Sequence, residues 1–225
     1  MKSMELFGMA LKCYFEGNRE CNLTIHNFGA DSAVIPMSVF FRQADLMEMD
    51  KTALKLCNGN ILDIGAGTGD HALFLLNHGY DVTALDISNS SCEIMKKRGI
   101  AKVVCCDIFN FETLKKFDTI LLLGRSIGAV GDINGFVIFL QIAKKYLKNN
   151  GHIIFNSVNE PSKSQWQSRQ MSFEYDKKVG DLVTWFDIGE ELLSQVATEN
   201  GYTSETKFTQ KDGNYLSLLT LNENG

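Results

Sequence analysis

The chain has 225 residues, of which 44% are hydrophobic and 22% are charged, and its formal net charge is -5. This composition is typical of a globular protein with a substantial core and excludes an intrinsically disordered chain. The negative charge argues against broad nucleic-acid binding, which requires a basic face.

The first 57 residues are predicted to form a helical cap in front of the main domain, residues 58–225. Met4–Phe15 is one candidate helix. Ser38–Cys57 is another, because its apolar residues recur at helical spacing. The segment between them, residues 17–36, is polar and is expected to be irregular.

From Asn60 onward, strand-like and helix-like segments alternate, and this pattern predicts right-handed crossovers and a mostly parallel sheet. The expected strands are 60–65, 81–86, 102–106, 118–123 and 151–157. The expected helices are 69–78, 89–98, 133–148 and 188–200. Two further strand-like runs, 202–208 and 215–221, flank an Asp-Gly pair and predict an antiparallel hairpin. The fold class is therefore α/β, with seven strands in one sheet.

An insertion of residues 158–187 follows the fifth expected strand and contains both tryptophans. Met171–Asp176 and Asp181–Phe186 can pair there as a hairpin. Loops at the carboxyl ends of strands are where open α/β sheets bind ligands. The aromatic residues can form a lid over a ligand or pack on the edge of the sheet. Trp166 is the better lid candidate, whereas Trp185 favours the packing role.

The segment Ile61–Gly69 reads Ile-Leu-Asp-Ile-Gly-Ala-Gly-Thr-Gly and is followed by a helical pattern. It predicts a buried strand, a tight turn and the start of a helix. Glycine allows a sharp turn and a close approach by a ligand, and the first amides of a helix have no partner within the helix. Asp86 ends the next strand, beside this turn, where its carboxylate can accept hydrogen bonds from ribose hydroxyls.

The spacing of these glycines separates two nucleotide-binding families. Dinucleotide-binding domains prefer Gly-x-Gly-x-x-Gly, but here Asp70 stands at the third glycine position, where its charge opposes a pyrophosphate. This argues against a nicotinamide-dependent oxidoreductase. The chain has an acid, one further residue and then Gly-x-Gly-x-Gly. This arrangement resembles the first motif of the class I S-adenosylmethionine-dependent methyltransferases. Their Rossmann-like sheet also ends with an antiparallel strand. The alternative is a glycine turn that only reverses the chain.

The resemblance implies which residues bind S-adenosylmethionine, whose product is S-adenosylhomocysteine. In the family, the acid matching Asp63 supports the turn and lies near the methionyl amine, Asp86 holds the ribose, and Ile87 packs on the adenine. Asp107 is implied to accept a hydrogen bond from the adenine amino group, or else it caps a short helix near residues 111–116. The full expected set is Asp63, Gly65, Ala66, Gly67, Gly69, Asp86, Ile87, Asp107, Ile108 and Gly124.

The turn at 124–128 is implied to face both the cofactor and the methyl acceptor. Many family members of similar sequence have asparagine where this chain has Arg125. A cation beside a sulfonium is repulsive, so we expect Arg125 to point outward, toward an anionic acceptor or a carboxylate of the chain. A surface ion pair of little energetic worth is the alternative. The expected acceptor contacts are Arg125, Ser126 and Trp166.

A general base is needed only if the acceptor must lose a proton early, so no catalytic residue is assigned. The candidates are Tyr14, His26, Glu160 and Asp187; His26 is attractive because an unperturbed histidine titrates near neutrality. The expected activity is methyl transfer to a nitrogen or oxygen atom of a small molecule. A tRNA or rRNA methyltransferase and a cofactor-binding module without turnover are the alternatives.

The six cysteines form no Cys-x-x-Cys pair and no histidine cluster accompanies them, so no metal is expected. Reduced thiols in a cytoplasmic chain are the simplest interpretation. We expect neither a signal peptide nor a membrane span, which needs roughly 20 apolar residues. Small molecules are the expected partners rather than nucleic acids, and the oligomeric state, monomer or dimer, is left open.

Overall fold

The computed structural model describes residues 2–159 and 165–222. Its larger sheet has seven strands in the order β11-β12-β7-β6-β3-β4-β5. The strands are β3 (Asn60–Ile64), β4 (Asp81–Asp86), β5 (Val103–Cys105), β6 (Phe117–Leu122), β7 (Leu147–Val158), β11 (Tyr202–Thr209) and β12 (Asn214–Leu221). The neighbours from β7 to β5 pair in parallel, and β12 and β11 complete the sheet in antiparallel pairing. The predicted fold class is confirmed.

The helices cover both faces of this sheet, which explains why its strands carry apolar residues in unbroken runs. They are α2 (Glu48–Leu56), α3 (Asp70–Asn77), α4 (Asn89–Lys97), α5 (Ile133–Tyr146) and α6 (Glu190–Glu199). One core lies under α5 and α6 and includes Leu62 of β3. The other lies under α2, α3 and α4 and includes Ile61 of the same strand. Adjacent residues of a strand point to opposite faces, so β3 serves both cores.

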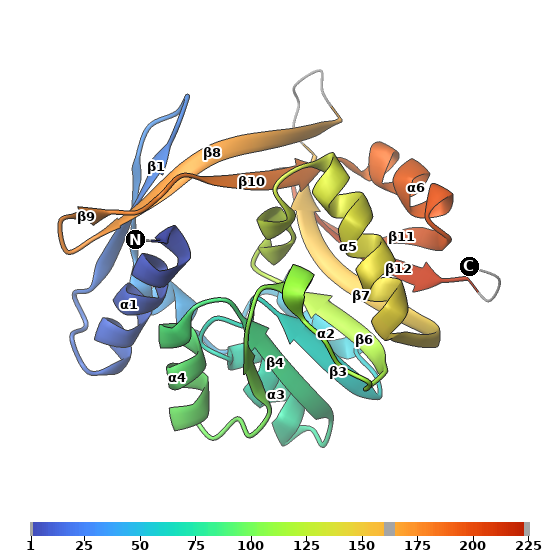
Figure 1. Cartoon of the computed structure of the whole chain (residues 1–225), viewed down its shortest axis with the longest axis horizontal. Coiled ribbons are helices and arrows are strands. Elements are labelled where there is room, and N and C mark those ends of the chain that lie inside the picture. The colour runs from blue at the N-terminus through green and yellow to red at the C-terminus, as the bar shows by residue number, and fades with distance from the viewer. Residues whose placement is uncertain (1, 160–164, 223–225) are drawn as a thin grey trace.

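A second sheet lies against the first and has the order β10-β8-β1-β2, with β9 paired to β8. Its strands are β1 (Asn22–Asn27), β2 (Ala33–Pro36), β8 (Trp166–Tyr175), β9 (Lys178–Val179) and β10 (Val183–Ile188). Figure 1 shows β8 and β10 running from the upper end of β7 to the side where the first helix lies. That helix, α1 (Ser3–Phe15), packs on one face of this sheet through a small apolar core that includes Leu11, Leu23 and Phe173.

Two N-terminal segments differ from expectation. Residues 17–36 are not irregular but contain β1 and β2, because β1 pairs with β8 from a distant part of the chain. The single helix expected at Ser38–Cys57 is interrupted: Met37–Phe40 is a 3-10 turn, and α2 begins only at Glu48. The Phe40 carbonyl accepts a hydrogen bond from Thr68 Oγ1 at 2.6 Å, and the Phe40 ring packs edge-on against Phe7. These tertiary contacts outweigh the local helical preference.

The expectation of reduced thiols is wrong for two of the six cysteines. Cys13 at the end of α1 and Cys21 before β1 form a disulfide, with their Cα atoms 6.4 Å apart. The other four, Cys57, Cys92, Cys105 and Cys106, are free. Over residues 2–159 and 165–222, none of the helices combines the length and hydrophobicity that crossing a membrane demands.

Candidate active site

Three glycines shape the turn between β3 and α3. Gly65, Gly67 and Gly69 have φ angles of 69°, 58° and 82°, in the left-handed region that favours glycine. The amides of Gly65 and of the next residue donate to the Leu85 carbonyl at 2.8 and 3.1 Å, which ties the turn to the end of β4. A Cβ at Gly65 would lie only 2.6 Å from Ser126 Oγ. Both the backbone conformation and the neighbouring turn therefore require glycine there.

The Asp63 carboxylate at the end of β3 is incompletely satisfied. The residue is 2% exposed, and within the described part of the chain its Oδ2 has no hydrogen-bond partner. Burial raises the pKa of Asp63 to about 6, while nearby His71 lowers it and Asp86 raises it. A buried carboxylate oxygen without a donor is costly. A positively charged amine would relieve this cost, so the residue fits its expected place near the methionyl amine.

The Asp86 carboxylate holds the end of β4 to the glycine turn. Its Oδ2 accepts the Gly67 amide at 2.8 Å, and its Oδ1 accepts the Ser88 amide at 2.9 Å. Burial raises the pKa of Asp86, and these amide donors oppose that rise. A carboxylate has about four lone-pair sites. Two backbone donors therefore orient the group and leave capacity for the two hydroxyls of a ribose.

Glu5 on α1 is a neighbour of this site that the sequence did not indicate. Its carboxylate accepts hydrogen bonds from Ser90 Oγ at 2.7 Å, from the Asn89 amide at 3.0 Å and from Ser88 Oγ at 3.1 Å. A Cβ at Gly8 would lie 2.0 Å from Ser88 Oγ, so glycine allows α1 to lie directly on the start of α4. The N-terminal helix thereby packs against the segment that follows Asp86.

The expected adenine end has two large apolar side chains with partly open surfaces. Ile87 follows β4 and is 39% exposed, and Phe109 lies in a 3-10 turn, Ile108–Asn110, and is 37% exposed. Asp107 caps this turn, accepting the Phe109 amide at 2.9 Å. The capping alternative is thus realised, but at residues 108–110 rather than 111–116. One cap hydrogen bond leaves the carboxylate able to accept others.

The turn after β6 lies against the glycine turn. Ser126 Oγ donates to the Leu123 carbonyl at 2.6 Å and is 3.4 Å from the Gly65 carbonyl. Gly124 and Arg125 both have positive φ angles, of 64° and 62°. The Arg125 amide donates to Asn156 Oδ1 at 2.9 Å, which holds this strained residue in place.

The Arg125 side chain pairs with a carboxylate of the chain itself. Its Nε donates to Asp187 Oδ1 at 3.1 Å, and its Nη2 makes a shorter contact with the same oxygen. Asp187 is 1% exposed, so this is not the weak surface pair considered as the alternative. Arg169 of β8 donates to the other oxygen of Asp187 at 2.7 Å. The sequence showed neither Asp187 nor Arg169 as a partner, because they come from different strands of the second sheet.

A second group that local sequence did not reveal surrounds Asp50 of α2. Arg42 Nη2 donates to Asp50 Oδ2 at 2.8 Å, and His71 Nε2 lies 3.6 Å from the same oxygen. Burial lowers the pKa of His71, but the contact with Asp50 and the charge of Asp63 outweigh burial and raise it. The contact between His71 and Asp50 links the N-terminal segment to the helix that follows the glycine turn.

The two tryptophans lie on opposite faces of the β8-β10 pair. Trp185 pairs across the strands with Arg169, whereas Trp166 pairs with Ile188 and lies near Phe186, with ring centroids 6.2 Å apart. Trp185 packs with the core under α1, and its Nε1 would lie 2.0 Å from a Cβ added at Gly128. Trp185, rather than Trp166, therefore faces the turn after β6.

Gly128→Ala is expected to lower the free energy of unfolding by about 1–3 kcal/mol, because overpacking forces a rigid ring to move. The added Cβ would also lie 2.3 Å from Cδ1 and Cε2 of Trp185. Chemical denaturation followed by tryptophan fluorescence measures the change. In a Trp185→Ala background the same substitution should cost little, and an equal cost there would contradict the steric explanation.

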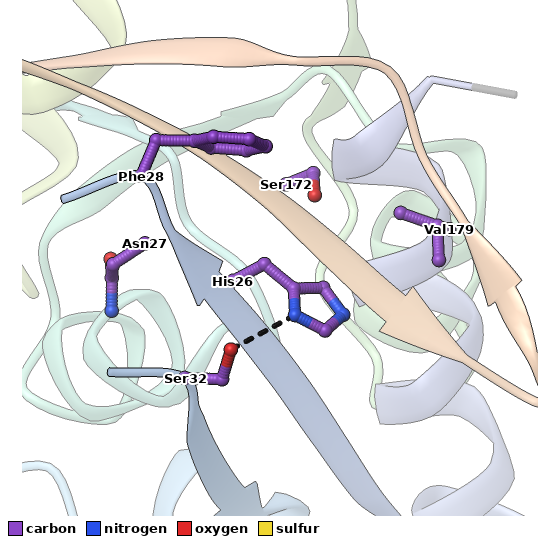
Figure 2. A pocket seen from close by; sticks show the side chains of 6 residues that line it. All are labelled: His26, Asn27, Phe28, Ser32, Ser172 and Val179. Carbon is purple, nitrogen blue, oxygen red and sulfur yellow. Dashed lines mark hydrogen bonds between the residues drawn. The ribbon is translucent and has the colours of Figure 1, made fainter. Parts of the chain in front are cut away.

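Of the four candidate bases, Asp187 lies beside the turn after β6, where Arg125 and Arg169 bind it. The contacts of Tyr14 and His26 are instead with segments other than the glycine turn. Tyr14 ends α1, where its ring stacks on Phe41. His26 of β1 lies on the face of the second sheet opposite to Ile25, which packs under α1. His26 lines a separate pocket of about 420 Å³ together with Ser32 (Figure 2), and Ser32 Oγ is 3.0 Å from His26 Nδ1. Glu160 lies outside the described residues.

Comparison with known proteins agrees with this geometry. The family described as methyltransferase domain matches residues 56–217. The crystal structure of an S-adenosylmethionine-dependent methyltransferase from Bacteroides fragilis, in complex with S-adenosyl-L-homocysteine, is similar with a TM-score of 0.91 and 29% identity. The likeness covers 99% of this chain and 97% of that one.

Two further relatives are more distant. The ubiquinone biosynthesis O-methyltransferase of Rickettsia akari is 30% identical over 109 residues, which is 46% of this chain and 42% of that protein, so the match spans less than half of its length. A methyltransferase structure from Clostridium acetobutylicum shares the fold alone, with a TM-score of 0.58, 16% identity and coverage of 80% of this chain and 91% of that one. The chain belongs to the class I S-adenosylmethionine-dependent methyltransferases.

Proposed function

We propose that the protein transfers a methyl group from S-adenosylmethionine to a nitrogen or oxygen atom of a small organic molecule. The observation that carries this proposal is the second sheet beside the turn after β6. Its strand β10 brings Trp185 against Gly128 and Asp187 against Arg125. A cover of protein over the transfer point favours a small acceptor over a polymer and excludes water. The net charge of -5 also disfavours RNA.

In this proposal the cofactor lies along the ends of β3, β4 and β5. Asp63 meets the methionyl amine, Asp86 accepts hydrogen bonds from the ribose hydroxyls, and Asp107 faces the adenine. Gly65, Ala66, Gly67 and Gly69 line the methionine and ribose, Ile87 and Ile108 border the adenine, and Gly124 borders the sulfur end. The orphaned Oδ2 of Asp63 and the exposed faces of Ile87 and Phe109 support this placement.

In this proposal, the part of the second sheet beside the turn after β6 binds the acceptor. Residues 1–57 and 158–187 both contribute strands to the second sheet, through the pairing of β1 with β8. Ser126 and Arg125 stand where this sheet meets the cofactor turn. Arg125 positions Asp187 instead of contacting the acceptor, because its Nε and Nη2 are already bound to that carboxylate.

When bound, S-adenosylmethionine supplies a methyl group on a positively charged sulfur, which is already activated toward a nucleophile. The side chains then have to align the acceptor and exclude water. The ion pair between Arg125 and Asp187 neutralises the cation that would otherwise repel the sulfonium. No general base is assigned, because two arginines bind Asp187 and the contacts of Tyr14 and His26 are with other segments. The relative named for O-methylation favours oxygen as one target atom.

The test is incubation of the full chain with methyl-labelled S-adenosylmethionine and separate pools of small metabolites and bulk RNA. We expect label in the small-molecule pool, with one molecule of S-adenosylhomocysteine formed for each methyl group transferred. Label in RNA alone would contradict the choice of acceptor class. Tight binding of the cofactor without product from either pool would instead indicate a binding module.

A further inference from the structure

A cluster of two arginines and one aspartate stands beside the turn where methyl transfer is proposed. Arg125 follows β6, and the next residue, Ser126, reaches the Gly65 carbonyl. Asp187 of β10 accepts hydrogen bonds from Arg125 and from Arg169 of β8. The cluster therefore connects the second sheet with the transfer point.

The pairing of β8 with β10 sets the side from which Arg169 enters this cluster. Arg169 lies directly across from Trp185, and Asp187 follows Trp185 by two residues, on the same face of the strands. Trp185 packs against Gly128, three residues beyond Arg125. Arg169 consequently faces the turn after β6 together with the indole.

The charges in this cluster do not balance. Arg125 directs Nε and Nη2 to Asp187 Oδ1, and Arg169 directs Nη2 to Oδ2. In the described ranges, 2–159 and 165–222, neither arginine forms an ion pair with any other carboxylate. Counted over the described residues, two guanidinium groups against one carboxylate leave one positive charge, in a chain whose net charge is -5.

Arg169 is the less satisfied of the two guanidinium groups. Among the described residues its buried Nε has no hydrogen-bond acceptor, and 35% of the side chain is exposed. Asp187 is only 1% exposed, and Arg125 alone would already neutralise it. If Arg169 had only a structural role, it would place a second cation beside Asp187, which needs only one. That cation would also lie near the proposed position of the sulfonium.

We infer that the methyl acceptor carries an oxyanion group, such as a carboxylate, which binds the Arg169 guanidinium. The inference rests on the proposed transfer to a small molecule and names its chemical class. Arginine presents a planar fork of donors that matches such a group. An anionic acceptor would balance the cluster, whereas an acceptor carrying only an ammonium group would be repelled by it.

The first test uses the charge of the labelled product from the metabolite pool. Products are applied to an anion-exchange resin at about pH 8 and then eluted at about pH 2. We expect retention of the label at the higher pH. Release at the lower pH identifies a carboxylate, and retention at both identifies a phosphate or sulfate. Label in the unbound fraction would overturn the inference while leaving small-molecule transfer intact. Absence of label from every pool would overturn both.

The second test compares Arg169→Gln with Arg169→Lys, using the retained fraction as acceptor. Arg169→Gln should raise the KM for this fraction at least tenfold, while the dissociation constant for S-adenosylhomocysteine changes less than twofold. Arg169→Lys keeps the positive charge and should raise the KM less than Arg169→Gln does. It therefore tests the role of Arg169 in acceptor binding even if the glutamine variant folds poorly. Lys178→Gln, which removes an exposed cation of the same sheet, is the matched control and should leave both constants unchanged. An unchanged KM in Arg169→Gln would overturn the inference, and so would a rise in KM for Arg169→Lys as large as that for the glutamine variant.

Discussion

Asp86→Ala is expected to weaken binding of S-adenosylhomocysteine by about 1–3 kcal/mol, or roughly 5- to 150-fold. The carboxylate that would hold the ribose hydroxyls is lost, and so are its hydrogen bonds to the amides of Gly67 and Ser88. Charge-assisted hydrogen bonds of this kind are stronger than neutral ones. Isothermal titration calorimetry at neutral pH measures the affinity.

The substitution also removes hydrogen bonds within the folded chain and can lower its stability. The melting temperature without ligand is therefore recorded as well. Asp86→Asn keeps the size of the side chain and separates the loss of charge from the loss of packing. Asp31→Ala removes an exposed acid between β1 and β2 and serves as the control. An affinity of Asp86→Ala within twofold of the original would contradict the assignment of the ribose to this residue.

Asp63→Asn is expected to have opposite effects on stability and on cofactor affinity. The pKa of Asp63 lies near 6 in the folded chain, against 3.8 for the ordinary side chain. Between about pH 4 and pH 6 the folded state retains a proton that the unfolded state releases. The free energy of unfolding should therefore fall as the pH rises through this interval, by about 3 kcal/mol in total.

The asparagine variant removes that pH dependence. Near pH 7 it should be the more stable form without ligand, because it no longer buries an ionised carboxylate without a full set of donors. Urea unfolding at several pH values between about 4 and 8 tests this, with His71 and Asp86 as the neighbouring groups that titrate beside Asp63. If the free energy of unfolding of the variant had the same dependence on pH as that of the unsubstituted chain, the assignment of this titration to Asp63 would be contradicted.

Cofactor binding should depend on pH in the reverse direction. The methionyl ammonium group favours the ionised form of Asp63, so affinity for S-adenosylhomocysteine should rise from about pH 5 to pH 7 by roughly tenfold and then level off. In Asp63→Asn the affinity should be weaker at pH 7 and nearly constant over this range. A parallel rise in the variant would assign the titration to another group, with His71 the nearest candidate.

The local sequence was sufficient to predict the larger sheet and the glycine turn between β3 and α3. Buried strands were recognised from apolar runs such as Ile61–Ile64, and Asp86 was expected beside the glycines because parallel neighbours end at the same edge of a sheet. The left-handed φ angles of Gly65, Gly67 and Gly69 follow from the same motif. These features depend on residues that are close along the chain.

The second sheet as a whole could not be predicted from local sequence, because its strands come from distant parts of the chain. β1 and β2 were not expected because β1 finds its partner in β8, as the contact between His26 and Glu174 across 148 positions illustrates. Because neighbouring residues of a strand point to opposite faces, His26 points away from α1, under which Ile25 packs. The same pairing placed Trp185, instead of Trp166, against the turn after β6.

Glycine spacing and the end of an apolar run constrain the backbone of a few consecutive residues. The sequence alone therefore determined the larger sheet and the resemblance to the family, and the resemblance implied the expected cofactor residues. The contacts of Arg125, Arg169 and Asp187 were decided only by tertiary structure. They join β6, β8 and β10, and no periodicity within one segment encodes which distant carboxylate a guanidinium will meet. The proposed acceptor side of the site rests on such contacts, and the proposal of an anionic acceptor therefore depends on the pairing of the strands.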